Sequence, residues 1–167
     1  AALESLARLV RPLGPRVRVT STSDRAIGRL HALAPWLALG FDPLRHLDAE
    51  PGPGKTVSRY LRRCGVYGYL DDHPLAADQW GAARDYLAMR AQLLWELAPV
   101  DAWCIRATLL ARVLTDGFDW IAWLHRRGAQ VIAWTLNPNQ PHQLALAADL
   151  IERGVDRITT DDAEGLA

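Results

Sequence analysis

The sequence predicts an α/β fold in which short strands alternate with helices. Two observations in the last third of the chain carry this prediction. An apolar run at 131–137 lies between two segments with helical spacing, and these segments close in Gly128 and Gly154. A short apolar run between helices is typical of a strand buried on both faces of a parallel sheet. Strands that alternate with helices in this way are joined by right-handed crossovers.

The first quarter of the chain contains two further helix–strand pairs. Apolar residues follow helical spacing over 3–10, until a proline and a glycine stop the segment. Residues 16–21 then alternate polar and β-branched side chains, as a strand does. Residues 22–24 (Thr, Ser, Asp) are candidate N-caps for the next helix, which ends at Pro35. The apolar run 37–41 is the second strand, and an Asp-Pro dipeptide ends it.

The middle of the chain departs from this rhythm. Residues 44–98 are expected to form an inserted loop followed by a long helix from about 78 to 97. The regular alternation then returns. We expect a strand at 100–107, helices at 109–114 and 118–127, the strand at 131–137, a helix at 142–153 and a last strand at 157–161.

Composition excludes several classes of protein. The 167 residues are half hydrophobic and carry 19 basic and 19 acidic side chains, so they suit one globular core and give no support for nucleic-acid binding. No apolar run approaches the roughly 20 residues of a membrane span. Cys64 and Cys104 have no metal or redox spacing. Two free thiols fit a reducing compartment, so we expect a cytoplasmic protein, although one disulfide between them stays open.

Five parallel strands leave two architectures open. They suit a small doubly wound domain, or part of a (β/α)8 barrel. A complete barrel needs roughly 200 or more residues, so this chain is too short for eight units. A small flavodoxin-like binder is disfavoured because no Gly-rich phosphate turn follows the first strand.

The last third of the chain resembles a known family. Residues 131–137 have the form V-x-x-W-T-L-N, and residues 154–161 have the form G-V-D-x-I-T-T-D. Together they are similar to the end of the glycerophosphodiester phosphodiesterase family. Segments 17–21 and 37–41 resemble two earlier strands of that family more weakly. Two positions depart from its pattern, since Thr22 replaces a pocket phenylalanine and Ala163 replaces a proline.

The resemblance implies the C-terminal part of a TIM (β/α)8 barrel. Residues 1–167 would form strands four to eight of one phosphodiesterase-like domain, and would begin in the helix after strand three. The family's His-Arg-Gly motif, its Glu-x-Asp metal pair, its second histidine and its metal-binding glutamate lie on the first three strands. None of these motifs occurs here. The chain would therefore supply no catalytic residue and no metal ligand.

The function implied is that of a phosphoric diester hydrolase in lipid and glycerol metabolism. The parent protein would hydrolyse small glycerophosphodiesters to glycerol 3-phosphate and an alcohol. A divalent metal, Mg2+ or Ca2+, would be bound in the complete barrel and not by this segment, which alone would be inactive. The alternative is a non-catalytic half-barrel that binds a ligand, or that self-associates through its open strand edges.

Four residues are candidates for substrate binding. Active sites of such barrels lie at the C-terminal ends of the strands. Trp134 would offer an apolar face to the alcohol part of the substrate, although core packing is the competing role. Arg106 would bind a phosphate bidentately, if it is not a surface ion pair. Asn137 and Ser21 would contact ligand at the rim, although Asn137 could instead form a turn before Pro138 and Ser21 could instead cap a helix.

Overall fold

The computed structural model describes residues 2–47 and 83–166, and its strands form one parallel sheet. The strand order is β1-β2-β3-β4-β5, the same as the order along the chain. The strands are β1 (Arg18–Ser21), β2 (Ala38–Phe41), β3 (Ala102–Arg106), β4 (Gln130–Trp134) and β5 (Arg157–Ile158). All four pairings between neighbouring strands are parallel. The predicted α/β class is therefore confirmed.

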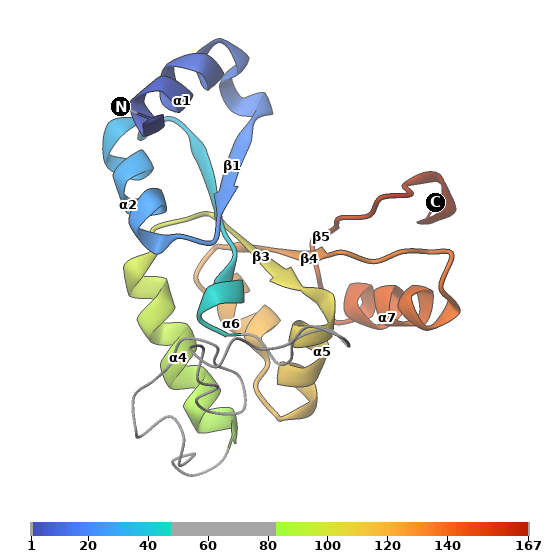
Figure 1. Ribbon diagram of the computed structural model, residues 1–167. Coiled ribbons are helices and arrows are strands. Elements are labelled where there is room, and N and C mark those ends of the chain that lie inside the picture. The colour runs from blue at the N-terminus through green and yellow to red at the C-terminus, as the bar shows by residue number, and fades with distance from the viewer. Residues whose placement is uncertain (1, 48–82, 167) are drawn as a thin grey trace, which may run out of the picture.

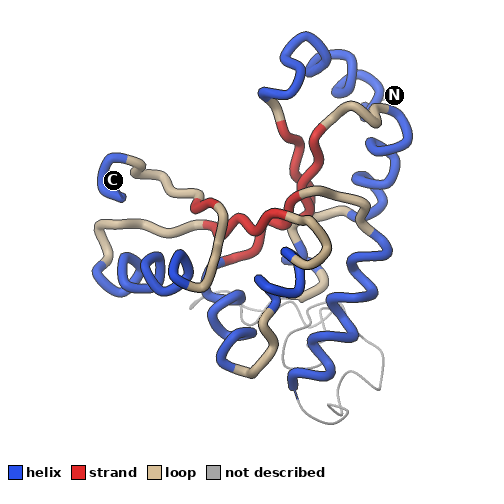
Figure 2. Tube along the Cα trace, turned by 180° about the vertical axis from the view of Figure 1, so that it is seen from behind, coloured by secondary structure: helices blue, strands red, loops and turns tan. Residues whose placement is uncertain are grey.

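The helices lie along one side of this curved sheet (Figures 1 and 2). They are α1 (Ala2–Val10), α2 (Asp24–Leu33), α4 (Ala83–Leu97), α5 (Ala107–Thr115), α6 (Trp120–His125) and α7 (Pro141–Glu152), with short 3-10 turns η1 (Arg11–Arg16), η2 (Pro43–Arg45) and η3 (Glu164–Leu166). A doubly wound sheet would change strand order at a switch point and carry helices on both faces. Sequential order with helices on one face is the wall of a barrel. The chain is thus a partial barrel.

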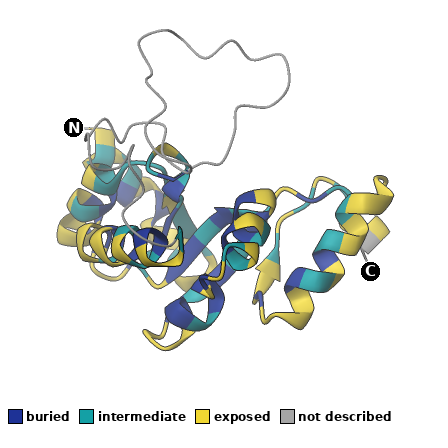
Figure 3. Ribbon diagram, turned by 90° about the horizontal axis from the view of Figure 1, so that it is seen from below, coloured by how far each residue is buried: buried dark blue, intermediate teal, exposed yellow. Residues whose placement is uncertain are grey.

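Aromatic side chains fill the layer between the sheet and the helices. Trp103 of β3 is fully buried at the centre of this layer. Its ring centroid lies 5.2 Å from that of Phe41 on β2, 6.3 Å from that of Trp95 on α4 and 5.8 Å from that of Trp120 on α6. The helices present their buried residues to the sheet and their exposed residues outward (Figure 3). This layer holds the strand ends in fixed positions.

Local sequence signals set the helix boundaries as predicted. The Ser23 hydroxyl accepts a hydrogen bond of 3.2 Å from the backbone N–H of Ala26, and so caps α2. Gly128 and Gly154 have φ angles of 78° and 97°, in the left-handed region that terminates helices. Both glycines follow helices that lead back to the start of a strand, which confirms their predicted role.

The strands are shorter than the sequence analysis predicted. The strand expected at 131–137 ends at Trp134, and the one expected at 157–161 ends at Ile158. At the end of β4 a side chain competes for the backbone hydrogen bond. The Asn137 backbone N–H donates to the Gln143 side chain at 2.6 Å, and the next residue, Pro138, has no N–H to donate. Similarly, β3 occupies Ala102–Arg106 within the predicted 100–107.

The outer strands leave two edges of the sheet open among the described residues. There, β1 pairs with β2 alone and β5 pairs with β4 alone. These edges are where the predicted self-association would occur, and it stays a prediction.

Most of the predicted inserted loop, residues 48–82 with Cys64, lies outside the described residues. Among those described, the Cys104 thiol is free and no helix is long and apolar enough to cross a membrane.

Candidate substrate-binding site

The face of the sheet opposite the helices carries a row of polar side chains. Trp103, Ile105, Val131 and Ala133 are buried toward the helices, so the alternate residues of β3 and β4 point the other way. Residues in parallel register share a face, which extends this set across the sheet. Its members are Arg18 and Thr20 on β1, Ala38 and Gly40 on β2, Ala102, Cys104 and Arg106 on β3, and Gln130, Ile132 and Trp134 on β4. This concave face is the candidate site.

Arg106 and Trp134 meet at the C-terminal edge of this face. They are register partners on β3 and β4, and both side chains are half-buried. The Trp134 indole N–H donates a hydrogen bond of 3.2 Å to the Cys104 carbonyl oxygen, which fixes the plane of the ring. Burial lowers the pKa of Arg106 and the nearby Asp42 raises it. The guanidinium nevertheless keeps its charge near neutral pH, because the ordinary pKa of an arginine lies far above neutral.

Asp42 joins this pair although the sequence analysis treated it only as the end of a strand. Its backbone N–H donates to the Ser21 carbonyl oxygen at 3.0 Å, and its Oδ1 accepts from the Leu44 N–H at 2.9 Å. Burial raises the pKa of the Asp42 carboxyl, while the Leu44 hydrogen bond and the charge of Arg106 lower it. Asp42 lies two residues after Gly40, so period-two alternation along 37–41 could have placed it on this face.

The other two predicted contacts, Ser21 and Asn137, make hydrogen bonds within turns. The Ser21 hydroxyl accepts from the Ser23 N–H at 3.1 Å. The Asn137 side chain accepts from the Asn139 N–H at 3.0 Å. For Asn137 this is the turn-forming role expected as its alternative, whereas Ser21 forms a turn and the helix cap expected as its alternative falls to Ser23. Contact of either residue with substrate stays a prediction, as it does for Arg106 and Trp134.

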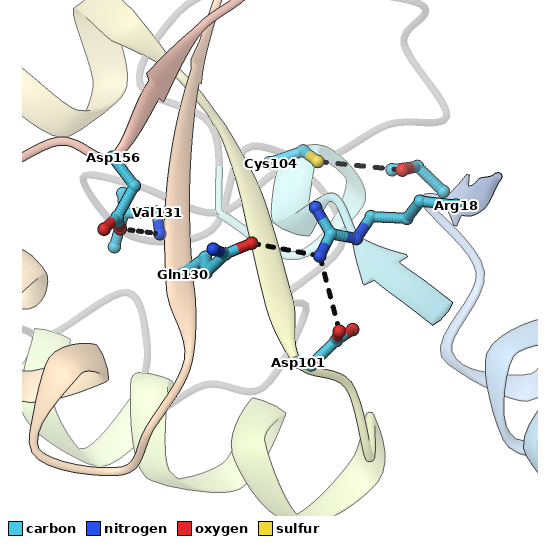
Figure 4. A network of polar contacts seen from close by, with 7 residues as sticks. Arg18, Asp101, Cys104, Gln130, Val131 and Asp156 are labelled. Carbon is cyan, nitrogen blue, oxygen red and sulfur yellow. Dashed lines mark hydrogen bonds and ion pairs between the residues drawn. The ribbon is translucent and has the colours of Figure 1, made fainter. Parts of the chain in front are cut away.

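A polar network crosses the N-terminal half of the same face (Figure 4). One Arg18 nitrogen lies 3.3 Å from an Asp101 carboxylate oxygen and 3.0 Å from the Gln130 side-chain oxygen. This contact passes over β2 because Gly40 has no side chain. A Cβ at Gly40 would lie 3.4 Å from the Arg18 Cδ and only 2.6 Å from the Thr20 hydroxyl oxygen. The network ties the edge strand β1 to β4.

Asp156, the last residue of the Gly-Val-Asp motif, links the start of the last strand to neighbouring elements. Its Oδ2 accepts a hydrogen bond of 2.7 Å from the Val131 backbone N–H and lies 2.9 Å from His125 Nε2. The carboxylate thus joins the start of β5 to the start of β4 and the end of α6. Burial raises the pKa of Asp156, but the bonds from Val131 and His125 outweigh it and lower the pKa.

Because the folded pKa of Asp156 is lowered, its ionised form stabilises the fold at pH values above the ordinary value of 3.8. This stabilisation is lost as the pH falls through the lower folded value. We expect Asp156→Asn to lower the free energy of unfolding by about 1 kcal/mol at neutral pH. The difference in this free energy between variant and wild type should become smaller toward pH 3. Urea unfolding at several pH values measures this. Asp149→Asn on α7 is the control, and a difference independent of pH would contradict the assignment.

A cavity lies at the other end of the sheet. It has a volume of about 700 Å³, and its lining includes Trp36, Trp95, Asp101 and Arg127. Asp101 precedes β3, so this cavity is at the N-terminal end of the strands. None of the four predicted site residues lines it. We place the candidate site at Arg106 and Trp134, because barrel enzymes carry their chemistry at the C-terminal strand ends.

The described residues do not form a metal-binding cluster. In 2–47 and 83–166, no three side chains of His, Cys, Asp or Glu come together as ligands would. Asp42 stands beside the positive charge of Arg106. Where the complete barrel would hold a metal stays a prediction.

Two solved structures resemble the chain over nearly its whole length. One is assigned as a glycerophosphoryl diester phosphodiesterase from Silicibacter pomeroyi DSS-3, with a TM-score of 0.58 and 18% identity, and the match covers 98% of this chain and 41% of that one. The other is a glycerophosphodiester phosphodiesterase from Parabacteroides distasonis ATCC 8503, with a TM-score of 0.52, 17% identity and coverage of 96% and 48%. No protein-family model and no curated protein matches the sequence.

These likenesses define the class of fold. The chain spans less than half the length of either structure, and at this identity the likeness shows the fold alone. The protein therefore has the fold of part of a phosphodiesterase barrel. This supports the family resemblance of the sequence at the level of the fold.

Proposed function

We propose that this chain forms the substrate-binding wall of a barrel that hydrolyses glycerophosphodiesters to glycerol 3-phosphate and an alcohol. One observation carries the proposal. Arg106 and Trp134 are register partners at the C-terminal ends of adjacent central strands, on the face away from the helices. A cation beside an aromatic plane suits a ligand with one phosphate and an adjoining carbon skeleton.

Each residue has a distinct role in this proposal. The Arg106 guanidinium donates hydrogen bonds to the non-bridging phosphate oxygens and neutralises part of their charge. The Trp134 ring, held by its bond to the Cys104 carbonyl oxygen, packs against the carbon atoms of the glycerol or alcohol. Together they fix the orientation of the ester bond relative to reactive groups supplied by the other strands of the barrel.

The proposal places the reactive groups outside the described residues. The divalent metal, Mg2+ or Ca2+, would be held by carboxylates elsewhere in the complete barrel, where it would neutralise charge on the phosphoryl oxygens. A role in lipid metabolism and a cytoplasmic location belong to this proposal too. They rest on the family resemblance and on two cysteines without metal or redox spacing.

The test uses the chain as it stands. Purified protein is mixed with glycerophosphoglycerol and Mg2+, and both binding and the release of glycerol 3-phosphate are measured. We expect weak binding, with a dissociation constant on the order of 1 mM for one wall of a site, and no product. Absence of binding would contradict the proposed wall. Metal-dependent product release by this chain alone would contradict the placement of the reactive groups elsewhere.

A further inference from the structure

Asp42 is held rigidly at the C-terminal end of β2. Its backbone N–H donates a hydrogen bond to the Ser21 carbonyl oxygen, and its Oδ1 accepts one from the Leu44 N–H. These two hydrogen bonds hold both the backbone and the side chain of Asp42 in place. A carboxylate with one oxygen bonded in this way cannot swing freely into solvent. Leu44 belongs to η2, which follows the strand at once, so the constraint is local and does not depend on a ligand.

Register places Asp42 beside the substrate-binding pair. Phe41 is the register partner of Trp103, so the next residue, Asp42, lies beside Cys104. Cys104 is two residues before Arg106 on β3, and the side chains of both point to the same face of the sheet. The charges of Asp42 and Arg106 act on each other, since each shifts the pKa of the other group toward its ionised form. Burial raises the pKa of the Cys104 thiol, and the charge of Asp42 raises it further. A negative charge therefore reaches the space in front of β3.

We propose that Asp42 is a specificity-determining residue, which makes the site prefer monoanionic phosphodiesters to dianionic phosphomonoesters. The inference rests on the proposed function, because it assumes that Arg106 binds the phosphate. The role of Asp42 also gives a reason why the product of the proposed hydrolysis is released from the site. That product is a phosphomonoester, and it meets the Asp42 carboxylate with an extra negative charge.

The expected size of the effect follows from charge alone. A phosphodiester carries one negative charge, whereas a phosphomonoester approaches two above its second pKa of about 6. Coulomb repulsion from a fixed carboxylate is proportional to the charge it faces. The factor by which Asp42 weakens binding of the dianion is therefore about the square of its factor for the monoanion. Removing the carboxylate is expected to tighten diester binding about threefold and monoester binding about tenfold.

The experiment compares two ligands that share a glycerol phosphate group. Glycerophosphoglycerol and glycerol 3-phosphate are titrated at pH 8 into wild type, Asp42→Asn and Asp42→Glu, and the Trp134 indole N–H signal is followed by NMR. Asparagine is as good an N-cap as aspartate, so the turn at Leu44 is retained without the charge. Asp42→Glu keeps the charge and should keep the preference for the diester. Asp116→Asn, on the helix side of the sheet, is the matched control.

Three results decide the matter. A gain for glycerol 3-phosphate that exceeds the gain for glycerophosphoglycerol in Asp42→Asn, and is absent in Asp42→Glu and Asp116→Asn, supports the proposal. Equal changes for both ligands, or none, overturn the role of Asp42 while the substrate-binding wall stands. If wild type binds neither ligand, the proposed function fails and the inference fails with it.

Discussion

Replacement of Trp103 by alanine is expected to lower the free energy of unfolding by about 3–5 kcal/mol. Trp103 is fully buried and its ring contacts rings from β2, α4 and α6. Removing it leaves a cavity between the sheet and the helices that none of these rigid neighbours can fill completely. The change is measured by chemical denaturation followed by circular dichroism. A loss of that size is a large part of the stability of a domain, so much of the variant is expected to be unfolded at 37 °C.

The matched control is Trp36→Ala. Trp36 is 41% exposed at the start of the segment that leads into β2. Its loss should therefore cost much less, about 1 kcal/mol or below. Equal effects of the two substitutions would contradict the claim that Trp103 is the centre of the packed layer.

Replacement of Arg106 by alanine is expected to weaken glycerophosphodiester binding by about 10- to 100-fold. Hydrogen bonds from a charged donor to a phosphate contribute about 1.5–3 kcal/mol, and the lysine variant would recover only the point charge. The measurement is an NMR titration of the purified variant, with unfolding measured in parallel because Arg106 is half-buried. Binding that survives in Arg106→Ala would remove Arg106 from the site.

Arg126→Ala serves as the control for that experiment. Arg126 is exposed and follows α6, so it lies near the N-terminal end of β4 and away from Arg106. Loss of a surface cation there should alter binding by less than about twofold, because exposed charges at that distance are screened by salt. A similar loss in both variants would indicate only a general effect of net charge.

The sequence predicted the order of elements well because each was specified locally. Helical spacing, the Ser23 cap and the glycines at 128 and 154 depend only on neighbouring residues. The ends of β4 and β5 were not predictable in this way. The end of β4 depends on the side chain of Gln143, six residues further along the chain from Asn137, which accepts the Asn137 N–H.

The candidate site likewise combines features that neighbouring residues determine with features that depend on distant parts of the chain. Arg106 and Trp134 could be assigned to the ends of two strands from sequence. That these strands are neighbours in register required the sheet itself. Asp42 was missed as a site residue because its importance comes from the proximity of Arg106, 64 positions away in the sequence, and no local pattern reports that proximity. The turn bonds of Ser21 and Asn137 are both local, and the one at Asn137 was expected from the sequence as its alternative role.

The central claim is that phosphodiesters bind at the C-terminal ends of β2, β3 and β4. The most direct test is to titrate wild-type protein with glycerophosphoglycerol and map the shifted NMR signals. We expect the largest shifts at the Trp134 indole N–H and at the amides of Asp42 and Arg106. Shifts confined to Trp36 and Trp95, which line the cavity at the opposite end of the strands, would contradict the claim.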